Sequence, residues 1–220
     1  MRFTEINVKE DVKLSEFYNK RIAISFSNEK PLRFQIPRMY MPFGVSGFTP
    51  EIGPTKWNID FSMKGWNEEN NYIHKFYNFV REVENHVINY VKENSVVIFG
   101  TQNIDLEKIF NSNIKEDFDR EHKFRVKLDT DQKNFIKPRI FDVNEVDVTR
   151  EAEKGLYSKH SGVSMVELNS VYFLNKKFGL TWKISQLKIY EPQRLHGFQF
   201  NIDDGPEEDE TEISGFQFQI

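Results

Sequence analysis

Residues 55–64, T-K-W-N-I-D-F-S-M-K, alternate between polar and apolar side chains after the first position. Trp57, Ile59, Phe61 and Met63 fall on one side of an extended chain, and the polar residues between them fall on the other. Successive side chains of a strand point to opposite faces, so this pattern predicts a β-strand with one buried face. We therefore expect the chain to form a sheet with one face packed against the core.

The same two-residue period predicts further strands over residues 21–27, 32–38, 123–128 and 137–143. Residues 163–174 and 178–190 predict a terminal hairpin that turns on residues 175–177. The last strand changes phase: Trp182 and Ile184 share the face that we expect to lie in the core, and Leu187 and Ile189 then occupy that face. A slip of one residue near Ser185 and Gln186 predicts a β-bulge.

Residues 68–93 follow the helical period instead. Their apolar positions recur every three or four residues, which predicts an amphipathic helix with the stripe Ile73, Phe76, Val80, Val83, Val87 and Val91. A short helix is expected over residues 105–110, with Asp105 as its N-cap, and a helix or turn over residues 149–156. Residues 37–54 contain four prolines and three glycines, so we expect a long exposed loop there.

This order of elements predicts a mainly β chain with inserted helices, of the α+β class. We expect an OB-fold-like five-stranded barrel with one long helix, and a β-sandwich or jelly roll is the alternative. The chain divides by composition into a body, residues 1–200, and a tail, residues 201–220. We expect the tail to be disordered, because it is acidic and carries Gly205 and Pro206.

Composition argues against an enzyme. The chain has no cysteine, which excludes thiol catalysis and a cysteine-ligated zinc site, and its five histidines are dispersed. No phosphate-binding or nucleophile-elbow glycine motif occurs. We therefore expect no catalytic residues, no metal and no cofactor. No apolar run approaches the ~20 residues that span a bilayer, so we expect no membrane association.

Charge is distributed unevenly. The net charge is −4, but the tail holds seven acidic residues and no lysine or arginine, which leaves 30 basic and 27 acidic side chains in the body. Lys123, Arg125 and Lys127 alternate with apolar residues and project from one face of their strand. An ordinary solvated face would look the same on any single strand, but several strands repeat the pattern. A cationic sheet face is suited to tracking a phosphate backbone.

Aromatic residues outside the core pattern gather in loops, where they either cap the ends of a barrel or stack on bases. The candidate DNA-binding residues are the cations of the strand faces and three of these rings: Arg33, Arg38, Tyr40, Phe43, Lys56, Lys64, Trp66, Lys123, Arg125, Lys127 and Lys183. The tail joins a flexible anion to an aromatic tip, and it is either a solubilising segment or a partner-binding one. Its candidate partner-binding residues are Asp209, Glu210, Glu212, Phe216 and Phe218.

Two segments carry a family resemblance: residues 36–48 (I-P-R-M-Y-M-P-F-G-V-S-G-F) and residues 171–183 (V-Y-F-L-N-K-K-F-G-L-T-W-K). Together with the strand before the long helix, they resemble a family of OB-fold single-stranded-DNA-binding proteins from large DNA viruses of eukaryotes. That family is similar to the replicative single-stranded-DNA-binding proteins of phages.

The resemblance implies sequence-independent binding of single-stranded DNA in viral replication, recombination or repair, in the host cytoplasm or nucleus. It also implies that the tail recruits a polymerase or helicase and competes for the DNA groove. Homo-oligomers are possible. A virion structural protein of jelly-roll type and an RNA-binding OB module remain the alternatives.

Overall fold

The computed structural model describes residues 1–117 and 120–192. Within these ranges, twelve strands belong to one sheet. The six in the first third of the chain are β1 (Val12–Leu14), β2 (Arg21–Phe26), β3 (Leu32–Gln35), β4 (Met39–Met41), β5 (Val45–Phe48) and β6 (Lys56–Ser62). The other six are β7 (Phe110–Asn111), β8 (Ile114–Lys115), β9 (Lys123–Leu128), β10 (Arg139–Phe141), β11 (His160–Leu174) and β12 (Lys177–Tyr190).

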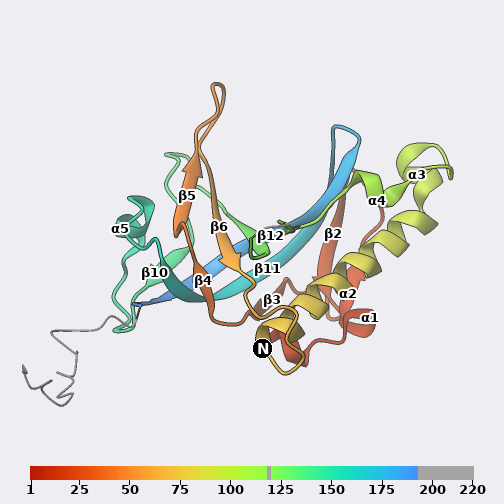
Figure 1. The fold of residues 1–220 in the computed structure, drawn as a ribbon. Helices are drawn as coiled ribbons and strands as arrows, with labels where there is room; N and C mark the ends of the chain where they lie inside the picture. Colours follow the sequence, from red (N-terminus) through yellow and green to blue (C-terminus); the bar gives the residue numbers. More distant parts are fainter. Residues whose placement is uncertain (118–119, 193–220) are drawn as a thin grey trace, which may run out of the picture.

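The main path of the sheet runs β1–β2–β11–β12–β9–β6–β5. The remaining strands branch from it: β3 and β4 pair with β11, β7 and β10 pair with β12, and β8 pairs with β9. The β5–β6 hairpin and the tip of the β11–β12 hairpin stand up from the sheet as two arms (Figure 1). A mainly β chain with a few helices is thus confirmed. The five-stranded barrel is not confirmed, because the sheet of the described residues is open.

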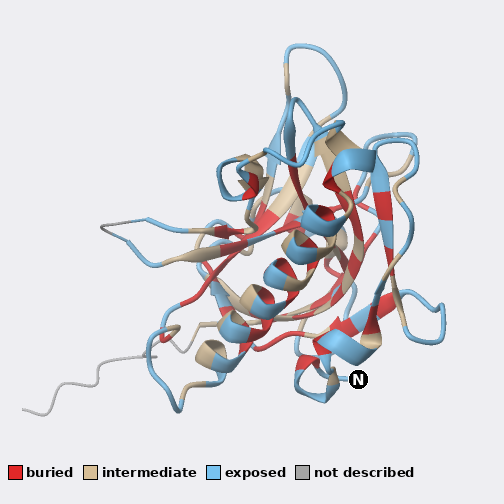
Figure 2. Ribbon diagram, turned by 90° about the vertical axis from the view of Figure 1, so that its right-hand side faces the viewer, coloured by how far each residue is buried: buried red, intermediate tan, exposed pale blue. Residues whose placement is uncertain are grey.

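Five α-helices and one 3-10 helix accompany the sheet in the described ranges: η1 (Phe3–Glu5), α1 (Val8–Asp11), α2 (Tyr72–Glu93), α3 (Ser95–Phe99), α4 (Leu106–Ile109) and α5 (Thr149–Glu153). The sheet curves around α2, the one long helix among them (Figure 2). None of the helices in the described ranges has the length and apolar character needed to cross a membrane.

Helix α2 begins four residues later than predicted. Asn71 caps it, with its side-chain oxygen accepting a hydrogen bond from the backbone N–H of Ile73 at 2.9 Å. Asparagine at this position satisfies an amide that the helix itself leaves unpaired, so the preceding residues 68–70 stay outside the helix. The predicted stripe is otherwise correct: its members from Phe76 to Val91 are buried, and Ile73 is half-buried.

The core lies between α2 and the sheet, and aromatic rings cross it. Phe124 of β9 meets Phe76 of α2 edge-to-face at 5.2 Å and Trp182 of β12 at the same distance. Phe34 of β3 also meets Trp182 edge-to-face, at 5.8 Å. Edge-to-face contacts of this kind add to the free energy gained by burying the rings. The predicted core position of Trp182 is confirmed, because its side chain is fully buried.

The prediction of a long irregular loop over residues 37–54 was wrong. The short strands β4 and β5 lie in this stretch, because its prolines fall before, between and after them rather than inside them. The turn between the two strands depends on Gly44, at φ +60°. A Cβ at this position would lie 2.8 Å from the backbone of Tyr157.

The terminal hairpin and its bulge are confirmed. β11 and β12 turn on Asn175 and Lys176, both with positive φ. The register shifts where Met165 faces Gln186 but Val166 faces Ile184, which leaves Ser185 as the additional residue. The N-cap at Asp105 is also confirmed, since its carboxylate accepts from the backbone N–H of Lys108. The predicted disorder of the tail lies outside the described residues.

Candidate nucleic-acid interface

The side of the sheet that faces away from α2 carries polar and charged side chains in register, and we call it the polar face. Asn58 of β6 lies opposite Lys127 of β9, which in turn lies opposite Lys183 of β12. The row continues from Lys183 to Glu167 of β11 and from Glu167 to Arg33 of β3. Residues directly opposite each other share one face of a sheet, so a single polar row crosses five strands.

The three predicted cations of β9 lie on this face, and each has a different neighbour. The amine of Lys123 lies 5.2 Å from the ring centroid of Phe43. The guanidinium of Arg125 donates two hydrogen bonds to the carboxylate of Asp60, at 2.7 and 2.8 Å. The amine of Lys127 lies 5.3 Å from the ring centroid of Tyr172 on β11. Two of the cations therefore stand over aromatic rings, and the third is neutralised by a carboxylate.

The pKa of Lys127 is lowered, first by partial burial of its amine and then by the positive charges of Lys56 and Lys183. Asp129 opposes the shift without cancelling it. An anion bound beside Lys127 would favour the charged form of its amine. The surroundings of Lys127 on the polar face are therefore favourable for a phosphate.

Tyr172 was missed by the sequence analysis, which placed the candidate rings in loops. Its hydroxyl accepts a hydrogen bond from the side-chain amide of Asn111 at 2.8 Å. Gly179 lies opposite it in the hairpin, and a Cβ there would come within 2.8 Å of the tyrosine hydroxyl. The glycine thus gives the ring room to lie on the polar face. A tyrosine placed opposite a glycine in a hairpin is the signal in the sequence that could have identified it.

A second group of predicted residues lies at the other end of β11 and β12. The guanidinium of Arg38 stands 4.2 Å from the ring centroid of Tyr190 and donates a hydrogen bond to the hydroxyl of Ser161 at 2.8 Å. Tyr40 of β4 lies opposite Ser161, and its ring is exposed. Tyr190 is another aromatic residue that the sequence analysis did not include.

Three predicted phosphate contacts are already ion-paired. Besides Arg125, the Arg33 guanidinium lies 2.6 Å from the Glu167 carboxylate, and the Lys183 amine lies 2.8 Å from the Asp129 carboxylate. These last two pairs border a hollow of about 350 Å³. Within the described ranges, no ion pair is formed by Lys56, Lys64, Lys123, Lys127 or Arg38.

Trp66 is the predicted residue that the structure places elsewhere. Its ring stacks on His122 at 4.4 Å and packs against Tyr77 of α2 at 4.9 Å, so it lies with the helix and not on the polar face. Phe48, in contrast, lies opposite Lys56 at the end of the β5–β6 pair and is 64% exposed. The five candidate residues of the tail, Asp209 to Phe218, lie outside the described residues.

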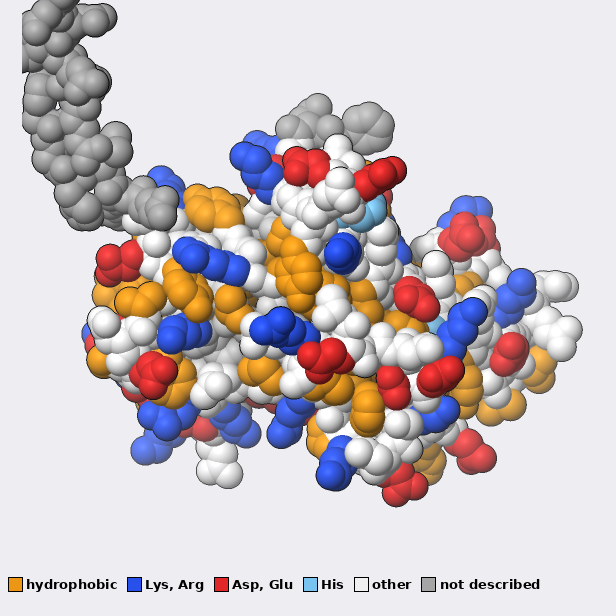
Figure 3. All heavy atoms as spheres, turned by 90° about the horizontal axis from the view of Figure 1, so that it is seen from below, with side chains coloured by type: hydrophobic (Ala, Val, Ile, Leu, Met, Phe, Trp, Pro, Cys, Tyr) orange, Lys and Arg blue, Asp and Glu red, His pale blue; other side chains and the backbone are white. Residues whose placement is uncertain are grey.

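The side of the molecule drawn in Figure 3 shows no single broad basic patch. Lysine and arginine side chains are interspersed there with hydrophobic and acidic ones (Figure 3). The polar face repeats this mixture at the scale of single contacts, where a cation adjoins a ring or a carboxylate. In the described residues, no group of three or more histidine, aspartate or glutamate side chains could hold a metal ion.

No protein-family model matches the chain, and no curated protein sequence matches it. Several solved structures do resemble it. The single-stranded DNA-binding protein of bacteriophage Enc34, in complex with ssDNA, is 9% identical, with a TM-score of 0.45 over 86% of this chain and 99% of that one. The single-stranded DNA-binding protein gp2.5 of bacteriophage T7 is 12% identical, with a TM-score of 0.49 over 86% of this chain and all of that one.

A C-terminal truncation of the Enc34 protein is 10% identical, with a TM-score of 0.47 over 84% of this chain and 97% of that one. These structural neighbours are thus phage single-stranded-DNA-binding proteins.

Proposed function

We propose that the chain binds single-stranded DNA, without regard to sequence, through the polar face. The observation that carries this proposal is the pairing of cations with rings along the face: Lys123 with Phe43, Lys127 with Tyr172, and Arg38 with Tyr190. Single-stranded nucleic acid offers a phosphate and an unstacked base at every nucleotide. A surface that repeats a cation beside a ring matches both groups at once.

The charges of the face support a flexible polyanion as the ligand. Lys56, Lys123, Lys127 and Arg38 form no ion pair within the described residues, and the pKa of Lys127 is lowered by burial and by the positive charges of Lys56 and Lys183. A rigid duplex would present its phosphates but not the faces of its bases. We therefore expect the rings to favour single strands over duplexes.

The biological setting belongs to the same proposal. We infer that binding serves viral DNA replication, recombination or repair, in the host cytoplasm or nucleus. The acidic tail would recruit a polymerase or helicase through Phe216 and Phe218 and would compete with DNA for the polar face. Its seven acidic residues against a mildly basic body support the second of these roles.

Fluorescence anisotropy with labelled oligomers tests the proposal. Three labelled ligands are each titrated with the protein at several salt concentrations: oligo-dT of about twelve nucleotides, the matching duplex and an RNA of the same length. We expect single-stranded DNA to bind best, with log K against log salt falling with a slope of about −3 for four phosphate contacts. The combined variant Lys123→Ala, Lys127→Ala should weaken binding about tenfold at low salt and make the slope less negative by about 1.4, because two contacts are lost.

Lys9→Ala with Lys92→Ala is the matched control, because it removes two exposed lysines from α1 and α2. It should bind like the unchanged protein. Equal affinity for duplex and single strand would contradict the role of the rings. Equal loss in the two double variants would show that the chain responds to net charge and has no defined face, and preference for RNA would favour the RNA-binding alternative.

A further inference from the structure

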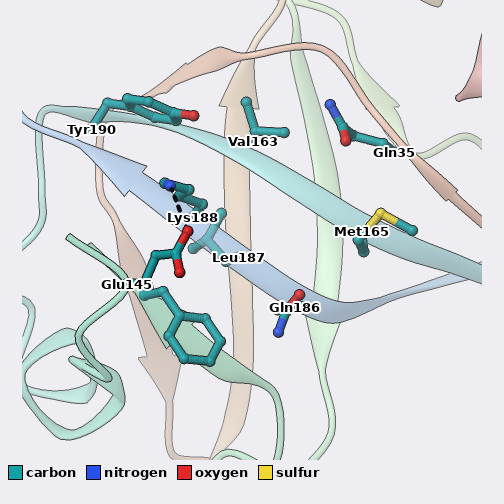
Figure 4. Close-up of a pocket in the computed structure, with 9 residues that line it drawn as sticks. Gln35, Glu145, Val163, Met165, Gln186, Leu187, Lys188 and Tyr190 are labelled. Atoms are coloured by element: carbon teal, nitrogen blue, oxygen red, sulfur yellow. Dashed lines mark ion pairs between the residues drawn. The ribbon is translucent and has the colours of Figure 1, made fainter. Parts of the chain in front are cut away.

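At the end of the polar face near Arg38 lies a hollow of about 400 Å³. Figure 4 shows Val163 and Met165 on β11, with Gln186 and Lys188 on the neighbouring β12. Gln35 comes from β3 on the other side (Figure 4). We call this the amide pocket, after its two glutamines. Its volume falls at the lower end of the range for pockets that hold small molecules, about 300–1,000 Å³.

The bulge at Ser185 brings Gln186 into the lining of the pocket. Trp182 and Ile184 point into the core, and an unbroken strand would send Gln186 after them. Because Ser185 is an additional residue, Leu187 and Ile189 take the core positions instead. Gln186 then turns to the polar face, opposite Met165. Bulges commonly re-aim a side chain beside a functional site.

The two glutamines flank one apolar side chain. Met165 pairs with Gln35 of β3 on one side and with Gln186 of β12 on the other. Neither glutamine side chain makes a hydrogen bond within the described residues. Each amide offers two N–H donors and a carbonyl acceptor. Two unused amides therefore stand on opposite sides of an apolar floor.

The rim of the pocket supplies a ring and cations. Tyr190 lies at its edge, with Arg38 over the ring at 4.2 Å. Lys188 forms one ion pair in the described residues, with Glu145 at 3.9 Å. That carboxylate is 85% exposed, so the pair is weak and a phosphate can replace it. Unstacked bases are held in proteins by rings or guanidinium planes together with hydrogen bonds to their edges.

We propose that the amide pocket accepts one unstacked nucleobase of the bound strand, lying over Met165 with its edge hydrogen-bonded by Gln35 and Gln186. This inference rests on the proposed function and adds a base-reading position to a surface that otherwise ignores sequence. Glutamine amides match the donor and acceptor pattern of some bases better than others. We therefore expect modest differences in affinity between strands of different base composition.

Competition between short homopolymers of dT, dA and dC, each about twelve nucleotides long, tests the inference. The affinities of the unchanged protein for the most tightly and the most weakly bound homopolymer should differ by about threefold or more. Gln35→Ala with Gln186→Ala should weaken the preferred homopolymer about fivefold and bring the three affinities together. Val163→Phe, which fills the pocket, should weaken all three. Gln102→Ala with Gln132→Ala is the matched control, since both residues are exposed elsewhere in the chain.

The outcomes separate the two proposals. If the unchanged protein binds no single-stranded DNA, both the proposed function and the pocket fail. If it binds, but the glutamine variant keeps the affinities and the ranking of the unchanged protein, the pocket fails alone. A thermal melt checks that each variant is folded. If the double variant does not fold, Gln186→Asn replaces it, because it shortens the side chain by one methylene. This variant should also reduce the differences between the three affinities.

Discussion

The two faces of the sheet use aromatic rings in opposite ways. On the face toward α2, the rings of Phe124 and Trp182 are fully buried and meet other rings edge-to-face. On the polar face, the rings of Tyr172 and Phe43 adjoin lysine amines and remain at least partly exposed. The first arrangement gains free energy by excluding water, and the second keeps ring faces available to a ligand. Aromatic content alone therefore does not identify a binding surface, whereas the groups that each ring contacts do.

The largest expected effect comes from the buried face. Trp182→Ala should lower the free energy of unfolding by about 3–5 kcal/mol, because it leaves a cavity among Phe34, Phe124 and the helix. Chemical denaturation measures the loss. Trp182→Phe is the matched variant: the indole N–H is buried without a partner in the described residues, so its removal sacrifices no hydrogen bond. We expect that variant to cost less than about 1.5 kcal/mol.

Folded Trp182→Ala protein should bind oligo-dT with nearly unchanged affinity. A stable Trp182→Ala protein that no longer binds DNA would reverse the assignment of the two faces.

Arg125 tests whether every cation of the polar face serves the same purpose. Its guanidinium covers Asp60, whose side chain is only 5% exposed. Arg125→Ala leaves that carboxylate nearly buried and unpaired, which should cost about 1–3 kcal/mol of stability. Its effect on DNA affinity should be smaller than that of Lys127→Ala, because the pair is already neutral.

Asp60→Asn separates the structural role of Arg125 from a direct one. The amide needs no counter-charge, so Arg125→Ala should cost less in the Asp60→Asn background than in the unchanged protein. Denaturation of the two single variants and the double variant measures the difference. A large loss of DNA binding from Arg125→Ala in folded protein, with little loss of stability, would place Arg125 among the direct contacts.

The strands could be predicted from the sequence wherever one face is buried. In β6, β9 and β12 the core fixes every second side chain, so the period of two survives in the sequence and even reveals the bulge at Ser185. The short strands β4 and β5 could not be found in this way. They hold only three and four residues, with Pro42 and Gly44 between them, so no period is established.

The composition of the polar face could be predicted in part. The alternation in β9 correctly places Lys123, Arg125 and Lys127 on one side of the strand. It says nothing about their neighbours, because Asp60 and Tyr172 belong to strands far away in the chain. The open order of the sheet was missed for the same reason: pairing between distant segments leaves no local signal. Trp66 was grouped with the loop rings because the sequence does not show that His122 covers it.

The lowered pKa of Lys127 predicts a pH effect that distinguishes it from ordinary surface lysines. A bound phosphate stabilises the charged amine and raises its pKa, so binding takes up a proton when the free amine is partly deprotonated. Affinity should therefore fall as pH rises into the alkaline range. Arginine keeps its charge there, so the Lys127→Arg variant should lose DNA affinity over the same pH range by a factor about three times smaller than the unchanged protein does. Anisotropy titrations at low salt measure this difference, and parallel curves would show that the Lys127 amine does not meet the strand.

The smallest expected effect concerns the pair between Lys183 and Asp129. Their 2.8 Å contact lies at the surface, where such pairs contribute at most about 1 kcal/mol, so a phosphate can displace the carboxylate. Asp129→Asn removes this competitor, and we expect oligo-dT to bind about two- to threefold more tightly at low salt, with the gain shrinking as salt screens the charge.

Asp105→Asn is the matched control. It also breaks an aspartate–lysine pair, with Lys108, but this pair lies on α4, and asparagine preserves the helix cap. Adding Lys183→Ala to Asp129→Asn should abolish the gain. If Asp129→Asn binds no more tightly than the control at any salt concentration, the strand does not pass Lys183, and the polar face that contacts DNA ends at Lys127.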